Sequence, residues 1–177
     1  AIGASCIRDV TIATQNSTPN PSSNDGIHCY ALECPGTLGI GGKLWDSTFV
    51  LLDMLYHHTD SLNNPYSTYI VGKNIIELGS GTGLGGTGLV GLQPNSVTLS
   101  DFPQVVPLLK ANILLNGMLL QDNNKGVLEQ RYTAMPLVWG ESIASEGRSD
   151  GDWSELDTII ACDCVYDPIG YAPLIHT

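Results

Sequence analysis

The chain has 177 residues, 42% of them hydrophobic, and a formal net charge of −11 at pH 7. This length and apolar content fit one folded domain and exclude wholesale disorder. The negative charge disfavours nucleic acid, whose phosphates it would repel, and favours a basic peptide or protein as partner. The chain lacks both a run of about 20 apolar residues, as a membrane-spanning helix needs, and the pattern of a signal peptide. We therefore expect no membrane association.

Residues 1–40 are predicted to form an N-terminal extension with a β-hairpin. Two β-like runs, Val10–Ile12 and Ile27–Leu32, flank a stretch rich in Asn, Ser and Pro. Such runs on either side of turn-forming residues indicate two paired strands outside the main sheet.

The next segment has helical character. Apolar residues crowd the stretch from Leu44 to Tyr56, and Asp46 or Ser47 can cap the N-terminus of a helix there. The polar segment 57–69 then predicts a loop.

A strand and a glycine-rich turn open the central block. Asn74–Leu78 is a short apolar strand that runs directly into Gly79–Gly83, and residues 84–92 can form a glycine-rich helix. A second strand, Val97–Ser100, ends at Asp101.

The alternation of strand and helix continues to the end of the chain. Pro103 opens a predicted helix that ends near Gly117, and a third strand is expected within 127–135. A fourth strand, within 156–162, precedes a helix that begins near Tyr171. Such alternation predicts an α/β domain, a Rossmann-like parallel sheet with helices on both faces, because parallel strands need crossover connections.

Three strand ends are expected to meet at one crevice. The glycine turn, Asp101 and Asp163 each follow a strand, and ligands of open α/β sheets bind outside the carboxyl ends of the strands. Glycines at 79, 81 and 83 allow a sharp turn and close approach of a ligand to the backbone. Asp101 stands where a carboxylate accepts hydrogen bonds from both ribose hydroxyls, so a nucleotide-containing cofactor is predicted.

Two cofactors compete for this crevice. Gly81–Gly86 satisfies the dinucleotide pattern G-x-G-x-x-G, which keeps an NAD-dependent dehydrogenase open as an alternative. Glu77, inside the strand, would repel a pyrophosphate but can help anchor a methionine ammonium group. The pattern therefore favours S-adenosylmethionine.

Five cysteines, an odd number without the dense spacing of a disulfide scaffold, indicate reduced thiols in a cytoplasmic or nuclear setting. Cys162 and Cys164 form a C-x-C pair, yet no second Cys/His pair with zinc-finger spacing follows. We expect no metal.

Six short motifs occur in a defined order along the chain. They are Gly42-Lys43-Leu44-Trp45-Asp46, Glu77-Leu78-Gly79-Ser80-Gly81-Thr82-Gly83-Leu84, Thr98-Leu99-Ser100-Asp101, Lys110-Ala111-Asn112, Trp139-Gly140 and Asp163-Cys164-Val165-Tyr166. Together they resemble the seven-strand (class I) S-adenosylmethionine-dependent protein-lysine methyltransferases, the lysine methyltransferase 16-type and methyltransferase-like 21 group. This branch modifies elongation factors and chaperone-type ATPases. The resemblance covers residues 27–177.

The resemblance implies a cofactor site residue by residue. Trp45 and the glycine turn would border the cofactor, Asp101 would hold the ribose, Trp139 would lie against the adenine, and the backbone at Cys162 would close the pocket. The full implied set of cofactor residues is Trp45, Glu77, Gly79, Ser80, Gly81, Gly83, Asp101, Trp139 and Cys162.

Asp163 and Tyr166 match the family's D-x-x-Y signature, which lines the opening where the lysine amine meets the methyl group. They are the implied catalytic residues, with Asp163 orienting the incoming ammonium. The structural alternatives are a helix cap for Asp163, a packed ring for Tyr166 and core positions for the two tryptophans.

The resemblance also implies three further strands after the fourth. We therefore expect residues 41–177 to be a C-terminally incomplete methyltransferase domain, a fragment. The expected function is methyl transfer from S-adenosylmethionine to a lysine of a protein substrate. A nicotinamide-type small-molecule N-methyltransferase and a non-catalytic binding module that keeps the fold remain alternatives.

Overall fold

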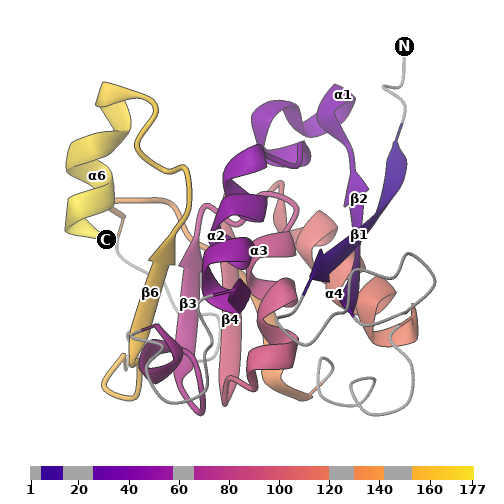
Figure 1. Ribbon diagram of the computed structural model, residues 1–177. Coiled ribbons are helices and arrows are strands. Elements are labelled where there is room, and N and C mark those ends of the chain that lie inside the picture. Colours follow the sequence, from indigo (N-terminus) through magenta and orange to yellow (C-terminus); the bar gives the residue numbers. More distant parts are fainter. Residues whose placement is uncertain (1–4, 14–25, 58–65, 120–129, 142–152) are drawn as a thin grey trace.

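Four parallel strands form the main sheet (Figure 1). The computed structural model describes residues 5–13, 26–57, 66–119, 130–141 and 153–177. The strands are β3 (Asn74–Leu78), β4 (Ser96–Asp101), β5 (Tyr132–Pro136) and β6 (Thr158–Ala161). Their spatial order is β5-β4-β3-β6, and every neighbouring pair is parallel. All four predicted strands are confirmed.

Helices connect these strands and flank them. The α-helices are α1 (Pro35–Leu38), α2 (Asp46–His57), α3 (Leu84–Thr87), α4 (Val106–Leu119) and α6 (Tyr171–His176). The 3₁₀ helices are η1 (Gly39–Gly42), η2 (Ser67–Tyr69), η3 (Gly88–Leu92) and η4 (Pro168–Gly170). Figure 1 shows α2 and α3 in front of the sheet and α6 beside the upper end of β6. The predicted α/β class is confirmed.

Two helices differ from their predicted bounds. α4 begins at Val106 instead of Pro103, because Val105 N–H donates to the Phe102 carbonyl at 2.8 Å and closes a turn first. It also continues through Gly117 to Leu119. The predicted helix over 84–92 is α-helical only in its first turn. Part of the predicted loop 57–69 lies outside the described residues.

The sheet buries apolar side chains on both faces, because successive strand residues point to opposite sides. Ile75 lies in the large core that α2, η3, α4 and the hairpin share. Ile76 and Leu78 lie in a smaller cluster with Leu137, against which Leu174 of α6 packs. Helices therefore lie against both faces, as expected. None of the described helices is long and apolar enough to cross a membrane.

The N-terminal hairpin is confirmed and packs against α4. Strands β1 (Cys6–Ala13) and β2 (Gly26–Glu33) are antiparallel, with Val10 opposite Cys29. Glu33 is 2% exposed, pairs with Arg8 and accepts a hydrogen bond from Leu44 N–H at 2.8 Å. This carboxylate thereby ties the hairpin to the segment that leads into α2.

Two asparagines of α4 complete the outer edge of β2. Asn116 accepts from Tyr30 N–H and donates to Tyr30 C=O, both at 2.7 Å. Asn112 does the same with Leu32, at 2.7 and 3.1 Å. The i, i+4 spacing on the helix matches the i, i+2 spacing on the strand. Each side-chain amide therefore makes the pair of hydrogen bonds to β2 that a residue of a neighbouring strand would make. Asn112 also donates to Thr82 C=O at 2.7 Å, inside the glycine turn.

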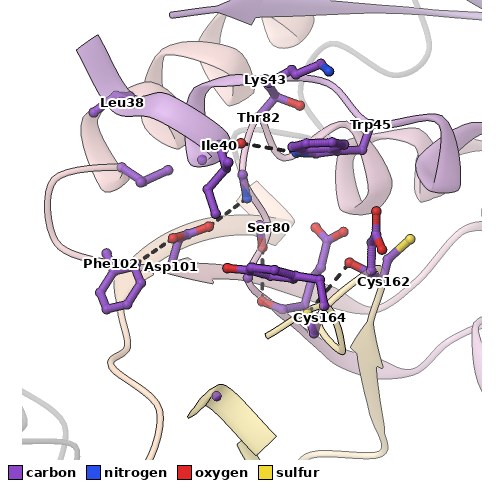
Figure 2. A pocket seen from close by; sticks show the side chains of 18 of the residues that line it. Leu38, Ile40, Lys43, Trp45, Ser80, Thr82, Asp101, Phe102, Cys162 and Cys164 are labelled. Carbon is purple, nitrogen blue, oxygen red and sulfur yellow. Dashed lines mark hydrogen bonds between the residues drawn. The ribbon is translucent and has the colours of Figure 1, made fainter. Parts of the chain in front are cut away.

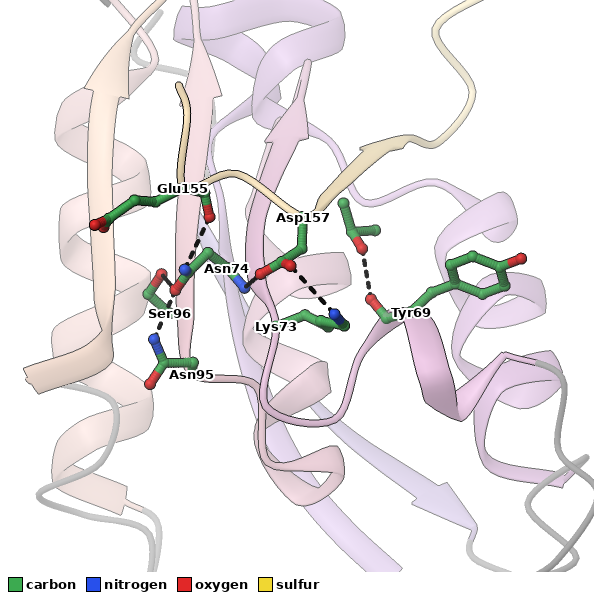
Figure 3. A network of polar contacts seen from close by, with 8 residues as sticks. Tyr69, Lys73, Asn74, Asn95, Ser96, Glu155 and Asp157 are labelled. Carbon is green, nitrogen blue, oxygen red and sulfur yellow. Dashed lines mark hydrogen bonds and ion pairs between the residues drawn. The ribbon is translucent and has the colours of Figure 1, made fainter. Parts of the chain in front are cut away.

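A polar network holds the opposite, amino end of the sheet (Figure 3). Asp157 accepts from Asn74 N–H at 2.9 Å and from Lys73 Nζ at 3.2 Å, just before β6. Asn74 Nδ2 donates to the carbonyl of Glu155. The contacts fix β6 beside β3 at the end far from the glycine turn.

Replacing Asn112 tests how far the fold depends on that side chain. Asn112→Asp removes both donated hydrogen bonds and leaves the carbonyls of Leu32, partly buried, and of Thr82, buried, facing a carboxylate. We expect the free energy of unfolding to fall by about 3 kcal/mol. Urea denaturation measures it, with Lys110→Gln on the exposed face of the same helix as the control. A loss no larger than that of the control would contradict this role.

Candidate functional site

A cavity of about 540 Å³ lies at the carboxyl ends of β3, β4 and β6. The direction in which successive strands are added to the sheet reverses at β3. Strands β4 and β5 lie on one side of β3, whereas β6 lies on its other side. Open α/β sheets bind ligands at such a switch point. The volume is typical of sites for small molecules.

The glycine turn forms the floor of the cavity. Gly79 and Gly81 have φ of +61° and +55°, and both line the cavity. A Cβ on Gly79 would come within 3.1 Å of Cys164 Sγ and of the Trp139 ring. Ser80 ties the turn to β4, since its hydroxyl donates to Glu77 C=O and accepts from Ser100 N–H, each at 3.0 Å. The turn thus presents backbone to the cavity in a fixed position.

Gly83 has a different environment from the other two turn glycines. It is absent from the cavity lining, and a Cβ there would lie 2.8 Å from Leu99 Cδ1 and 2.9 Å from Leu109 Cδ2. With φ at +76°, Gly83 allows α3 and the sheet to approach closely. Its predicted contact with a cofactor has no support from this placement.

Asp101 lies beside the turn and is 9% exposed. Its Oδ2 accepts from Gly81 N–H and its Oδ1 from Phe102 N–H, both at 2.7 Å (Figure 2). Burial raises the pKa of Asp101, and these two hydrogen bonds oppose the shift. Each carboxylate oxygen keeps a further lone pair, so Asp101 can still accept hydrogen bonds from a ligand's hydroxyls.

Glu77 is the most deeply buried carboxylate of the site, at 3% exposed. Burial raises its pKa to about 7, with a further increase from the charge of Asp101, and a hydrogen bond from Gly86 N–H opposes this. A Cβ on Gly85 would lie within 2.2 Å of Glu77 Oε1, so the glycines of α3 make room for the carboxylate. A cationic ligand group in the cavity would favour its charged form.

Trp45 forms the wall opposite the glycine turn. Its indole N–H donates to Ile40 C=O at 3.1 Å, and Lys43 Nζ lies 4.3 Å from the centre of the ring. Figure 2 shows Lys43 on one side of the ring and Ser80 and Cys164 on the other. The second face of the indole therefore looks onto the cavity.

The segment after β6 closes the remaining side. Cys164 is buried and donates to Leu78 C=O at 3.2 Å, and burial raises its pKa to about 12. Asp163, just before it, is exposed and has a positive φ of +59°. Tyr166 is 59% exposed and lines the cavity with Asp163, so both predicted catalytic side chains lie at its open side.

Every predicted site residue except Gly83 lines this one cavity. The lining members of the prediction are Trp45, Glu77, Gly79, Ser80, Gly81, Asp101, Trp139, Cys162, Asp163 and Tyr166. The cavity is also lined by residues that were not predicted to belong to it, among them Leu38, Ile40, Lys43, Ser47 and Phe102. The only local signal for them was their nearness to Trp45 or Asp101 in the sequence. Among the described residues, no three His, Cys, Asp or Glu side chains group as metal ligands do.

The fold and the cavity define an α/β protein with a cavity of ligand size at the switch point of its sheet. Residues 25–177 match the family described as lysine methyltransferase, and the chain belongs to this family.

Three relatives have names that agree with this assignment. The chain is 30% identical over 146 residues to protein-lysine N-methyltransferase EFM6 of Saccharomyces cerevisiae, covering 74% of this chain and 54% of the yeast protein. It is 28% identical over 142 residues to protein N-lysine methyltransferase METTL21A of Xenopus tropicalis, covering 79% and 54%. It is 28% identical over 164 residues to protein-lysine N-methyltransferase EEF2KMT of Mus musculus, covering 91% and 43%. The chain spans about half the length of these relatives.

The family implies S-adenosylmethionine as methyl donor, and the cavity residues fit it. Gly79 and Gly81 leave the floor free of side chains, Asp101 offers oxygens to hydroxyl groups, and Glu77 offers a carboxylate to an ammonium. Carboxylates suit a ligand with cationic groups far better than they suit a pyrophosphate.

The buried Glu77 predicts an unusual dependence of stability on pH. Its pKa is about 7 in the folded chain against an ordinary 4.5, so the folded state binds the proton more tightly than the unfolded state. The stabilisation is complete below pH 4.5 and is lost as pH rises through 7, about 3 kcal/mol in all. In urea unfolding at pH 5 and pH 8, Glu77→Gln should lose less stability between the two values than the unsubstituted chain. An equal loss in both would contradict the shift.

Proposed function

We propose that the chain transfers a methyl group from S-adenosylmethionine to a lysine side chain of a protein. The observation that carries the proposal is the convergence of the glycine turn, Asp101 and Asp163 on one cavity in a chain of the lysine methyltransferase family. Protein-lysine methyltransferases among its relatives support the same reaction class. No feature of the cavity favours nicotinamide or another small acceptor.

The residues of the cavity divide into two groups in this proposal. Asp101 accepts hydrogen bonds from the ribose, the glycine turn lies along the donor, and Glu77 attracts its ammonium group. Trp45 and Trp139 add apolar walls that exclude water. When bound, S-adenosylmethionine supplies a methyl group that its sulfonium charge already activates.

The second group acts on the acceptor. Asp163 accepts hydrogen bonds from the incoming lysine ammonium and orients its nitrogen toward the donor. The ammonium releases a proton to solvent, and the free lone pair forms the new carbon–nitrogen bond as the carbon–sulfur bond breaks. Tyr166, beside Asp163, narrows the opening around the lysine side chain. The main contributions of the chain to the reaction are therefore the alignment of the lysine nitrogen with the donor and the exclusion of water.

The acceptor is proposed to be a protein with a basic surface near its target lysine. A net charge of −11 attracts such a partner at long range, so association should weaken with salt. An elongation factor or a chaperone-type ATPase fits the resemblance seen in the sequence. A cytoplasmic or nuclear location remains a prediction from the cysteine pattern.

Radiolabelled S-adenosylmethionine tests the reaction directly. Incubated with an extract from its own source, the chain should label a protein band. Asp163→Ala should lower that labelling at least tenfold, because the acceptor nitrogen loses its orienting carboxylate. Label found only in small molecules would refute protein methylation, and donor binding without any transfer would support the binding-module alternative.

Donor binding is tested separately by calorimetry. Asp101→Asn replaces one acceptor oxygen of the carboxylate with an NH₂ group, which only donates. We expect the Kd for S-adenosylmethionine to rise at least tenfold, about 1.4 kcal/mol. Asp157→Asn, at the amino end of the strands, is the matched control and should leave Kd within about twofold. Tighter binding of NAD than of S-adenosylmethionine would refute the proposed cofactor.

A further inference from the structure

One hydrogen bond crosses the open side of the cavity between distant parts of the chain. Ser47 Oγ donates to Asp163 Oδ2 at 3.2 Å, across 116 residues of sequence. Ser47 belongs to the first turn of α2, and Asp163 follows β6. Both residues line the cavity.

Ser47 stands on a firmly anchored helix. Leu52 and Leu55 of α2 are 1% and 4% exposed in the large core. Tyr56, near the end of the helix, donates to Gly88 C=O at 2.7 Å. The position of the Ser47 backbone is therefore set by the core and does not depend on the segment after β6.

Asp163 lies in the segment after β6, which is tied to the sheet at Cys164. Its φ of +59° is a conformation that residues other than glycine adopt at a cost, and the neighbouring Cys164 is held by Leu78 C=O. The Asp163 side chain itself is exposed. Among the described residues, Ser47 is the one hydrogen-bond donor to its carboxylate.

We infer that Ser47 is a positioning residue that holds the Asp163 carboxylate in the orientation needed for the acceptor lysine. The hydroxyl occupies Oδ2, which leaves Oδ1 to accept a hydrogen bond from the lysine ammonium. Without Ser47, the exposed carboxylate would rotate among its side-chain conformers. A smaller fraction of encounters with the acceptor would then find the carboxylate in the orientation that the reaction needs. This inference rests on the proposed methyl transfer.

A purely structural reading of Ser47 makes different predictions. A serine in the first turn of a helix often caps that helix, and its loss would then destabilise α2 itself. The positioning role instead changes the segment after β6 and the use of the acceptor, while α2 and donor binding stay as they were. Ser47→Ala removes the hydroxyl, and Ser47→Thr keeps it.

Hydrogen exchange tests the contact without any need for activity. In Ser47→Ala, we expect backbone amides of residues 162–167 to exchange about threefold faster or more, with amides of residues 46–57 unchanged. Ser47→Thr should restore the original rates. Unchanged exchange in 162–167, or faster exchange confined to 46–57, would overturn the inference.

Methyl transfer tests the consequence. With saturating labelled S-adenosylmethionine and limiting amounts of the extract, Ser47→Ala should label the acceptor band about fivefold more slowly, and Ser47→Thr should recover most of the rate. At saturating extract the deficit should shrink, and the Kd for the donor should be unchanged. A donor Kd that rises as much as the rate falls would overturn the inference. If the unsubstituted chain binds the donor but labels nothing, the proposed function fails, and hydrogen exchange alone then decides whether Ser47 holds Asp163.

Discussion

The position of the whole site depends on the buried side chain of Asn112. Its amide joins three elements at once, because it pairs with Leu32 of the hairpin, donates to Thr82 of the glycine turn and belongs to α4. Its partners are backbone groups in buried or partly buried positions, where a missing hydrogen bond costs free energy. The hairpin, which looks peripheral in the ribbon, therefore helps to hold the turn that forms the cavity floor (Figure 1).

Concentrated negative charge is the second constraint. Glu77, Asp101 and Asp163 share one cavity, while Lys43 is the one cation among the described residues that line it. Burial raises the pKa of Glu77 and of Asp101, and the charge of Asp101 raises that of Glu77 further. Binding of a ligand with cationic groups relieves this repulsion. The electrostatic repulsion that lowers the stability of the chain at high pH would therefore strengthen the binding of the positively charged donor and acceptor that we propose.

The cavity is assembled from a buried part and an exposed part. Its floor belongs to β3, β4 and the turn that follows β3, where the hydroxyls of Ser80 and Ser100 are hydrogen-bonded to the backbone of the strands. Its open side combines Asp163 and Tyr166, both exposed, with the first turn of α2. In the proposed function, the buried floor would bind the methyl donor, and the exposed opening would admit the lysine of another protein.

The sequence by itself determined the strands, the glycine turn and the two aspartates that follow strands. These features are local, since apolar runs, turn glycines and strand-terminal carboxylates are readable within a few residues, and parallel pairing then brings the strand ends together. Only the tertiary structure decided which glycine contacts the core, so that Gly83 packs against Leu99 and Leu109 while Gly79 and Gly81 face the cavity. The sequence likewise did not predict the burial of Glu77, the placement of Asn112 or the contact of Ser47 with Asp163. Each depends on elements that meet only after the chain has folded, and no local pattern records such long-range packing.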